Sequence, residues 1–201
     1  MEINFTKAKL DMETRTLSLE LTEESLEGVR ESLERREPTL DDYRTIKSYV
    51  DACKALGEEP FDFEETCDIL DPHIVALMQL ETISRALWGR DFEPEPQGEW
   101  DGETYYYWPW FRFYSEEDMA KIKANPSGCT IAALFAGYAS AGAAAGFGYL
   151  STNNRPADTG AHIGFRLCQE TEERARYFGV QFANLWADYL AYGFEIEERV
   201  I

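Results

Sequence analysis

Residues 128–168 read GCTIAALFAGYASAGAAAGFGYLSTNNRPADTGAHIGFRLC, and this stretch decides the fold class that we expect. Only Arg155, Asp158 and Arg166 carry charge in it. No uninterrupted apolar run reaches the roughly 20 residues that a membrane-spanning helix needs. We interpret the stretch as strands that are separated by turns. We predict three of them, at about 130–138, 145–151 and 161–168, with a loop at 153–156 between the last two.

A dense aromatic run precedes this stretch. Residues 105–114 read YYYWPWFRFY, a composition typical of a strand. Because Pro109 has no amide hydrogen to donate, we expect this strand at a sheet edge or with a bulge. Its pairing with the three later strands predicts an antiparallel sheet. A short helix should separate them, capped by Ser115 and ending near Ala124.

An amphipathic helix follows the stretch, from its N-cap Thr171 to about Tyr192. Its apolar residues recur every three or four positions and predict one continuous face. They are Ala175, Phe178, Phe182, Leu185, Trp186, Tyr189 and Leu190. We expect this face to cover the C-terminal sheet.

The N-terminal half is predicted to be mostly helical. Strands at 2–10 and 15–22 would form a hairpin, followed by a surface helix at about 23–36. A second helix is predicted from Thr39 to Gly57, because Thr39-x-x-Asp42 has capping-box spacing. A third should begin at Asp71-Pro72 and run to Trp88.

These elements predict an α+β protein of three segments. Residues 1–38 hold the hairpin and a helix, residues 39–104 hold helices and an acidic linker, and residues 105–201 hold the sheet and the terminal helix. No charged segment followed by an apolar run opens the chain, so we expect no signal peptide and a location in the cytoplasm.

The net charge of −19 is concentrated in the first half. Residues 1–104 hold 27 acidic and 11 basic residues, a balance of −16, whereas residues 105–201 hold 11 and 8, a balance of −3. Residues 58–71 alone carry seven acids and no base. A protein that tracks nucleic-acid phosphates needs the opposite sign, so we expect no direct nucleic-acid binding. We interpret residues 58–71 as a solvated loop.

The sequence offers no clear catalytic or metal-binding pattern, and we expect no enzymatic activity, no metal and no cofactor. The four cysteines, at 53, 67, 129 and 168, form no CxxC pair, and the only histidines are His73 and His162. The glycines at 142, 146 and 148 lack the G-K-[ST] ending of a phosphate-binding loop. We expect buried free thiols.

The aromatic run is the candidate binding surface. Alternate residues of a strand face opposite sides, so one set should pack under the terminal helix and the other could stack on a partner. With the two arginines of the uncharged stretch, the candidate binding residues are Tyr107, Trp108, Trp110, Phe111, Phe113, Arg155 and Arg166.

Several segments resemble an uncharacterised family of small proteins that phages and prophages of gut bacteria encode. Residues 46–57, IKSYVDACKALG, are similar to its IKTFEDACKALG helix, and residues 106–111, YYWPWF, to its YYPWF motif. Further similarities are GFGY at 146–149, DTG at 158–160, GFRLC at 164–168 and ERARYFGVQF at 173–182. The resemblance spans about residues 45–190. The N-terminal hairpin and helix and residues 115–143 depart from the pattern. The resemblance implies a mobile-element origin and no particular reaction.

A second resemblance concerns GYLST at 148–152 and GFRLC at 164–168, which are similar to closing strands of C-type-lectin-like folds. It implies a receptor-binding component of a virion.

These observations lead to three hypotheses for the function. The first is a non-enzymatic phage or prophage accessory protein that binds a host or phage macromolecule, with a protein partner and an undetermined oligomeric state. The second is an acidic nucleic-acid mimic that inhibits a host defence system, which requires Glu58, Glu59, Glu64, Glu65 and other acids to form regular rows. The third is the lectin-like virion component.

Overall fold

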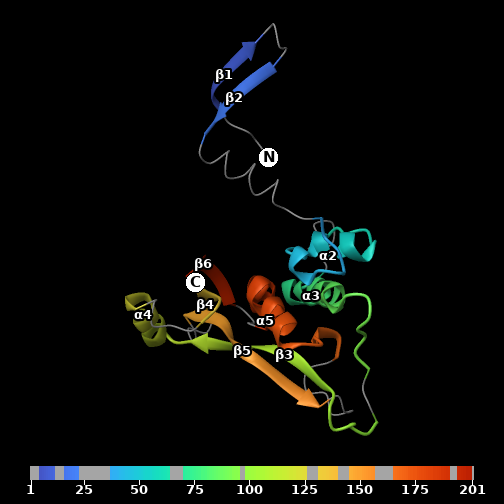
Figure 1. The fold of residues 1–201 in the computed structure, drawn as a ribbon. Coiled ribbons are helices and arrows are strands. Elements are labelled where there is room, and N and C mark those ends of the chain that lie inside the picture. The colour runs from blue at the N-terminus through green and yellow to red at the C-terminus, as the bar shows by residue number, and fades with distance from the viewer. Residues whose placement is uncertain are drawn as a thin grey trace. The chain divides into compact units, whose positions relative to one another are not determined.

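The computed structural model describes residues 5–11, 16–22, 37–63, 70–95, 98–125, 131–139, 145–156, 165–190 and 194–200. The chain divides into two units, residues 1–37 and residues 38–201. Helices and an antiparallel sheet occur together, which confirms the α+β class (Figure 1).

The first unit contains a β-hairpin. Strands β1 (Phe5–Asp11) and β2 (Thr16–Leu21) pair antiparallel, with Ala8 opposite Leu19 and Leu10 opposite Leu17. The predicted hairpin is confirmed. The helix predicted at 23–36 lies outside the described residues.

The second unit is built on a four-stranded antiparallel sheet (Figure 1). Its order is β3 (Tyr105–Tyr114), β5 (Gly146–Pro156), β4 (Leu134–Ala139) and β6 (Phe194–Arg199). The aromatic strand β3 is an edge strand, as its proline predicts. It also pairs irregularly with β5, since Trp110 lies opposite Ser151 and Phe111 opposite Tyr149, which leaves Leu150 as an extra residue.

Two of the predicted strand boundaries are wrong. Residues 153–156, predicted as a loop, continue β5. They pair with the long aromatic strand β3, whose register with β5 extends to the pair of Tyr105 and Pro156. The described part of the predicted strand at 161–168 is a 3-10 turn, η3 (Phe165–Leu167). The next residues leave the turn toward the sheet edge, where Gln169 exchanges backbone hydrogen bonds of 3.0 and 2.8 Å with Tyr107. The lectin-like resemblance depends on a strand at this place.

The terminal helix is broken in two. Helix α5 (Glu172–Gln181) ends at Phe182, whose φ of −111° and ψ of 26° are not helical, and α6 (Ala183–Leu190) follows. The break lets α5 pack on β3 and β5 while α6 packs mainly on α3 (Pro72–Trp88). The strand β6 after these helices was not predicted, because its sequence FEIEER is mostly charged.

The helix predicted from Thr39 begins later. Helix α2 (Tyr49–Leu56) starts after Ser48, whose Oγ accepts the Asp51 amide at 3.1 Å, and ends at Gly57 in the left-handed conformation, as predicted. The short turn η1 (Tyr43–Thr45) precedes it. The predicted start of α3 at Asp71-Pro72 is confirmed, as is α4 (Glu116–Ala124) with its cap Ser115.

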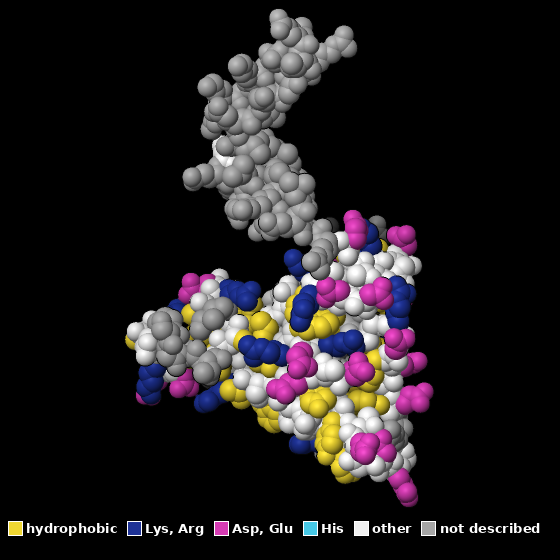
Figure 2. All heavy atoms as spheres, viewed as in Figure 1, with side chains coloured by type: hydrophobic (Ala, Val, Ile, Leu, Met, Phe, Trp, Pro, Cys, Tyr) yellow, Lys and Arg dark blue, Asp and Glu magenta, His cyan; other side chains and the backbone are white. Residues whose placement is uncertain are grey.

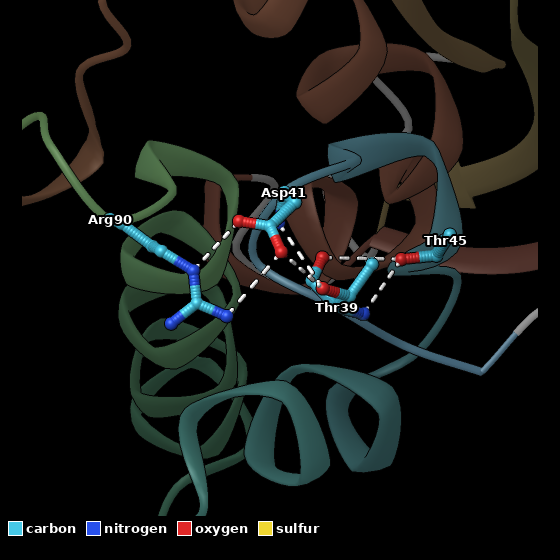
Figure 3. A network of polar contacts seen from close by, with 4 residues as sticks. All are labelled: Thr39, Asp41, Thr45 and Arg90. Carbon is cyan, nitrogen blue, oxygen red and sulfur yellow. Dashed lines mark hydrogen bonds and ion pairs between the residues drawn. The ribbon is translucent and has the colours of Figure 1, made fainter.

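Thr39 belongs to a polar network instead (Figure 3). Its amide donates to Thr45 Oγ1 at 2.9 Å, and its hydroxyl contacts Asp41. Arg90, in the turn after α3, donates from Nε to Asp41 Oδ1 at 2.7 Å, and this guanidinium lowers the pKa of the Asp41 carboxyl. The network attaches the segment before α2 to the end of α3.

The main core lies between the sheet and the helices. Leu80, Ile83 and Leu87 of α3 are fully buried with Phe147 of β5 and Phe178 of α5. A smaller cluster joins Met119 of α4 to side chains of the sheet, namely Tyr114, Leu134 and Ala136. Both clusters belong to residues 38–201. None of the helices in the described ranges combines the length and apolar character that a bilayer crossing needs.

Candidate functional site

The structure buries much of the predicted aromatic surface. Trp108 is 5% exposed and belongs to the main core. Phe111 stacks on Phe147 with ring centroids 5.0 Å apart and meets Trp186 of α6 at 5.3 Å. Tyr107 is partly buried, and its outward backbone groups are used by Gln169. Trp108 and Phe111 therefore pack in or against the core, and the backbone of Tyr107 binds Gln169.

Trp110 and Phe113 remain about half exposed, at 48% and 47%. They lie three positions apart on β3, on either side of the pairing irregularity between Trp110 and Phe111. Phe113 contacts the rings of Phe147 and Phe194, on the face that Phe111 shares with α6.

The two predicted arginines lie on different elements. Arg155 is exposed on β5, opposite Tyr106, and donates from Nη1 to the carbonyl of Asn154 at 3.3 Å. Arg166 lies in η3 and forms an ion pair with Glu81 of α3 at 3.2 Å. Of the predicted binding residues, Arg166 lies in a larger concave site.

This site, which we name the α2–α3 groove, has a volume of about 550 Å³. It is bounded by α3, by the chain that follows α2, and by η3. The residues that line it are Tyr49, Glu58, Glu59, Phe61, Phe63, Met78, Glu81, Thr82, Arg85, Trp88 and Arg166. Its volume falls within the range of about 300–1,000 Å³ typical of ligand sites.

An aromatic wall forms one side of the groove. Gly57, at a φ of 72°, ends α2 and lets the chain turn back. The amide of Phe61 then donates to the Tyr49 hydroxyl at 3.0 Å. The Phe63 ring lies 5.4 Å from Tyr49 and 5.0 Å from Phe61, in edge-to-face contacts. Partial burial raises the pKa of Tyr49, so its hydroxyl stays protonated at neutral pH.

Helix α3 provides the opposite side. Its groove residues are spaced by three or four positions and therefore share one helix face, from Met78 through Arg85 to Trp88. Trp88 is fixed by a hydrogen bond of 2.7 Å from Nε1 to the carbonyl of Cys168. Met78 is 38% exposed and Phe61 is 47% exposed. The groove thus presents accessible apolar side chains on a fixed support.

The charges of the groove are arranged in pairs. Arg85 donates to both carboxylate oxygens of Glu58, at 3.0 and 2.6 Å, and this hydrogen bonding raises the pKa of Arg85. Arg166 is neutralised by Glu81. Glu59 is exposed, and within the described parts of the chain it has no ion pair or hydrogen bond. The three glutamates and two arginines that line the groove therefore sum to one net negative charge.

A smaller hollow of about 250 Å³ adjoins the groove, and Phe63 lines both. Its other lining residues are Leu70, Pro72, Val75, Ala76, Gln79, Leu185 and Asp188. Local desolvation raises the pKa of Asp188. The hollow continues the apolar surface of the groove toward α6.

The metal-binding and thiol groups of the described residues can be examined directly. No group of three or more His, Cys, Asp or Glu side chains among them could hold a metal ion. Cys53 and Cys168 are free and buried, as predicted, and burial raises the pKa of Cys168 to about 12. A thiol with this pKa is almost entirely protonated at neutral pH and is a poor nucleophile. Cys67, Cys129 and His162 lie outside the described residues.

Sequence reasoning missed the groove, because residues 58–71 were interpreted as a solvated loop. Its first part instead packs against α3 through Phe61 and Phe63. Two phenylalanines inside an acidic run were the available signal. On the face drawn in Figure 2, the described basic and acidic side chains are interspersed with apolar ones.

Comparison of the chain with protein-family models, with curated proteins and with solved structures finds no match in any of the three. The class of this protein is therefore defined by its own fold and groove. It is an α+β protein with a hairpin unit and an aromatic-walled groove between two helices.

Proposed function

We propose that this protein is a non-enzymatic phage or prophage accessory protein that binds a host or phage protein through the α2–α3 groove. The proposed origin rests on the family resemblance of residues 45–190. The proposed place of action is the cytoplasm of the bacterial host. The proposed mode of action, binding without turnover, rests on the groove.

The composition of the groove is the observation that carries the proposal. Binding energy at protein interfaces is concentrated in aromatic residues and arginine, and methionine is also enriched there. The groove contains Tyr49, Phe61, Phe63 and Trp88, with Met78 and two arginines. By comparison, the hollow beside α5 holds about 300 Å³ and is lined by two aromatic residues, Tyr43 and Tyr177.

The polar groups of the groove also favour binding over catalysis. Arg85 and Arg166 are held by carboxylates. The Tyr49 hydroxyl is protonated at neutral pH, as in any ordinary tyrosine, and partial burial raises its pKa further. No side chain of the groove is thus paired as a nucleophile with a base, whereas fixed ion pairs and aromatic anchors suit recognition of a protein surface.

The test is capture of partners from host lysate by immobilised protein, followed by mass spectrometry. We expect Phe61→Ala to reduce recovery of the partner at least tenfold, because it removes an exposed anchor from the groove. Leu150→Ala is the matched control, since Leu150 is 46% exposed on β5 and does not line the groove. A partner lost equally with both variants, or with neither, contradicts the proposal, as does substrate turnover that one side-chain change abolishes.

A further inference from the structure

We propose that the occupant of the α2–α3 groove is a protein segment that presents a Lys or Arg side chain beside an apolar one. This inference rests on the proposed function and names the chemistry of the partner. It follows from two properties of the groove, an apolar wall and an uncompensated negative charge.

The apolar half of the site is formed by Phe61, Phe63 and Met78. The two phenylalanine rings meet edge to face at 5.0 Å, so they form a wall of fixed shape. Phe61 and Met78 are 47% and 38% exposed, and an apolar side chain placed between them removes this surface from water. Such burial favours binding in proportion to the apolar area that is removed from water.

The charged half of the site selects a cation. The lining holds three glutamates and two arginines, and both arginines are already ion-paired. Arg85 forms a bidentate ion pair with both carboxylate oxygens of Glu58, so it attracts a further anion only weakly. Glu59 is the carboxylate left over. An anionic segment would meet repulsion here, and a cationic one meets a free partner.

The surrounding charge acts in the same direction. Glu59 belongs to the run of residues 58–71, which carries seven acids and no base, in a chain of net charge −19. Fields of this kind accelerate the approach of a basic partner and weaken within a Debye length of about 8 Å at physiological salt. At physiological salt, only acidic groups within about 8 Å of the bound segment therefore contribute to this preference for a cation.

The aromatic wall can also contact the cation directly. Phe61 is two residues from Glu59, and both line the groove. A guanidinium or ammonium over an aromatic face is attracted by the negative face of the ring. The adjoining hollow adds a second carboxylate, Asp188, which is exposed at the surface and whose pKa is raised by local desolvation. A neighbouring cation would stabilise its charged form.

The experiment uses a fluorescein-labelled nine-residue peptide with three Lys-Leu pairs separated by glycine, and fluorescence anisotropy with the full chain. Two peptides of the same length serve as comparisons, one with Glu in place of Lys and one with Ser in place of Leu. We expect the Lys-Leu peptide to bind, the Glu-Leu peptide not to bind, and the Lys-Ser peptide to bind at least tenfold more weakly. Tighter binding of the Glu-Leu peptide would overturn the inference.

Matched variants separate the groove from general attraction to an acidic protein. Glu59→Gln should weaken binding of the Lys-Leu peptide about threefold to fivefold, a fold-change typical of an exposed ion pair. Glu197→Gln makes the same charge change on β6, where Glu197 is exposed, and should change binding less than twofold. Phe61→Ala should weaken binding about tenfold, against less than twofold for Leu150→Ala. Equal losses for Glu59→Gln and Glu197→Gln would show non-specific charge attraction and reject the inference.

Failure of this inference is distinguishable from failure of the proposed function. If Phe61→Ala abolishes capture of a partner from lysate while Glu59→Gln changes neither that capture nor peptide binding, the groove is the binding site and its ligand is not cationic. If neither Phe61→Ala nor Glu59→Gln changes capture or peptide binding, both the proposed function and the inference are rejected.

Discussion

Single residues determine how closely the helices approach the sheet. Gly179 of α5 lies directly over the aromatic strand, and an added Cβ would lie 2.5 Å from the Cβ of Pro109 and 2.6 Å from the Tyr149 ring. No other residue type leaves this space free. The close approach of α5 to β3 and β5 therefore depends on a glycine in the middle of a helix.

We expect Gly179→Ala to lower the free energy of unfolding by about 1 kcal/mol or more. Alanine favours a helix by about 1 kcal/mol over glycine, but overpacking in a core costs about 1–3 kcal/mol. Urea unfolding followed by circular dichroism measures the difference. Gly98→Ala is the control, because nothing lies within 4 Å of an added Cβ there. A more stable Gly179→Ala variant would show that the helix can move away from the strand.

The buried thiol of Cys168 predicts a pH dependence. Burial raises its pKa from 9.0 to about 12, so the folded state holds the proton more tightly than the unfolded state. The resulting stability is complete below pH 9 and is lost as the pH rises toward 12, at up to about 1.4 kcal/mol per pH unit.

Cys168→Ala should remove this part of the alkaline loss, so that its free energy of unfolding changes less steeply between pH 9 and 11 than that of the natural chain. Urea titrations at several pH values measure both slopes. Parallel slopes for the two proteins would mean that Cys168 ionises as readily in the folded state as in the unfolded one.

At the scale of elements, the capping residues decide where α2 begins. Both Thr39-x-x-Asp42 and Ser48-x-x-Asp51 have capping-box spacing. The structure uses the second, in which Ser48 Oγ accepts the Asp51 amide at 3.1 Å and Asp51 accepts the Lys47 amide at 3.1 Å. The helix that starts at Tyr49 buries Ala52 and Cys53 and packs against α3.

We therefore expect Ser48→Ala to cost about 1 kcal/mol of stability, the usual loss for an N-cap. Thr39→Ser, which keeps a hydroxyl, should cost less than about 0.5 kcal/mol, because Thr39 Oγ1 makes only exposed contacts with Asp41. Thermal unfolding followed by the helix signal in circular dichroism compares the two variants. A larger loss for Thr39→Ser would place the functional cap at the earlier motif.

The ion pair that joins the aromatic wall to α3 should also be measurable. Arg85 and Glu58 are each a little less than half exposed and share two hydrogen bonds. A double-mutant cycle with Arg85→Met and Glu58→Gln should give a coupling of about 0.5–1 kcal/mol that decreases with added salt. The same cycle with Arg166→Met and Glu81→Gln should give less, because Arg166 is far more exposed. A coupling of zero for Arg85 and Glu58 would mean that the wall is held by its aromatic contacts alone.

At the scale of the whole molecule, the described core belongs to residues 38–201. Every member of its three apolar clusters lies in that unit. The sheet edge at β6 is protected by charge, since five of its six residues are exposed and four are charged. The unit thus has its own core and a protected edge.

Residues 38–201 alone should therefore fold with a free energy of unfolding within about 0.5 kcal/mol of the transition of the same unit in the full chain. Urea unfolding followed by tryptophan fluorescence reports on this unit, because all five tryptophans lie in residues 38–201. A lower stability of the shorter chain would reveal a contribution from residues 1–37.

Much of the fold was predictable from local pattern. Alternation indicated the hairpin, aromatic content and Pro109 indicated an edge strand, and Asp71-Pro72 indicated the start of α3. The candidate site was harder, because burial of an aromatic side chain depends on what lies opposite. Trp108 and Phe111 look as suited to binding as Phe61 and Phe63, yet the first pair is in the core and the second lines the groove.

The sequence by itself determined the α+β class, the charge asymmetry and the elements whose caps and periodicity are local, such as α3 and α4. Tertiary structure alone decided the extension of β5 along the aromatic strand, the break at Phe182, the strand β6 and the turn at Phe165–Leu167. Each of these depends on a partner far away in the chain. The groove depends on such partners as well, because Glu58 and Arg85, and likewise Glu81 and Arg166, meet only after α2, α3 and η3 have packed together.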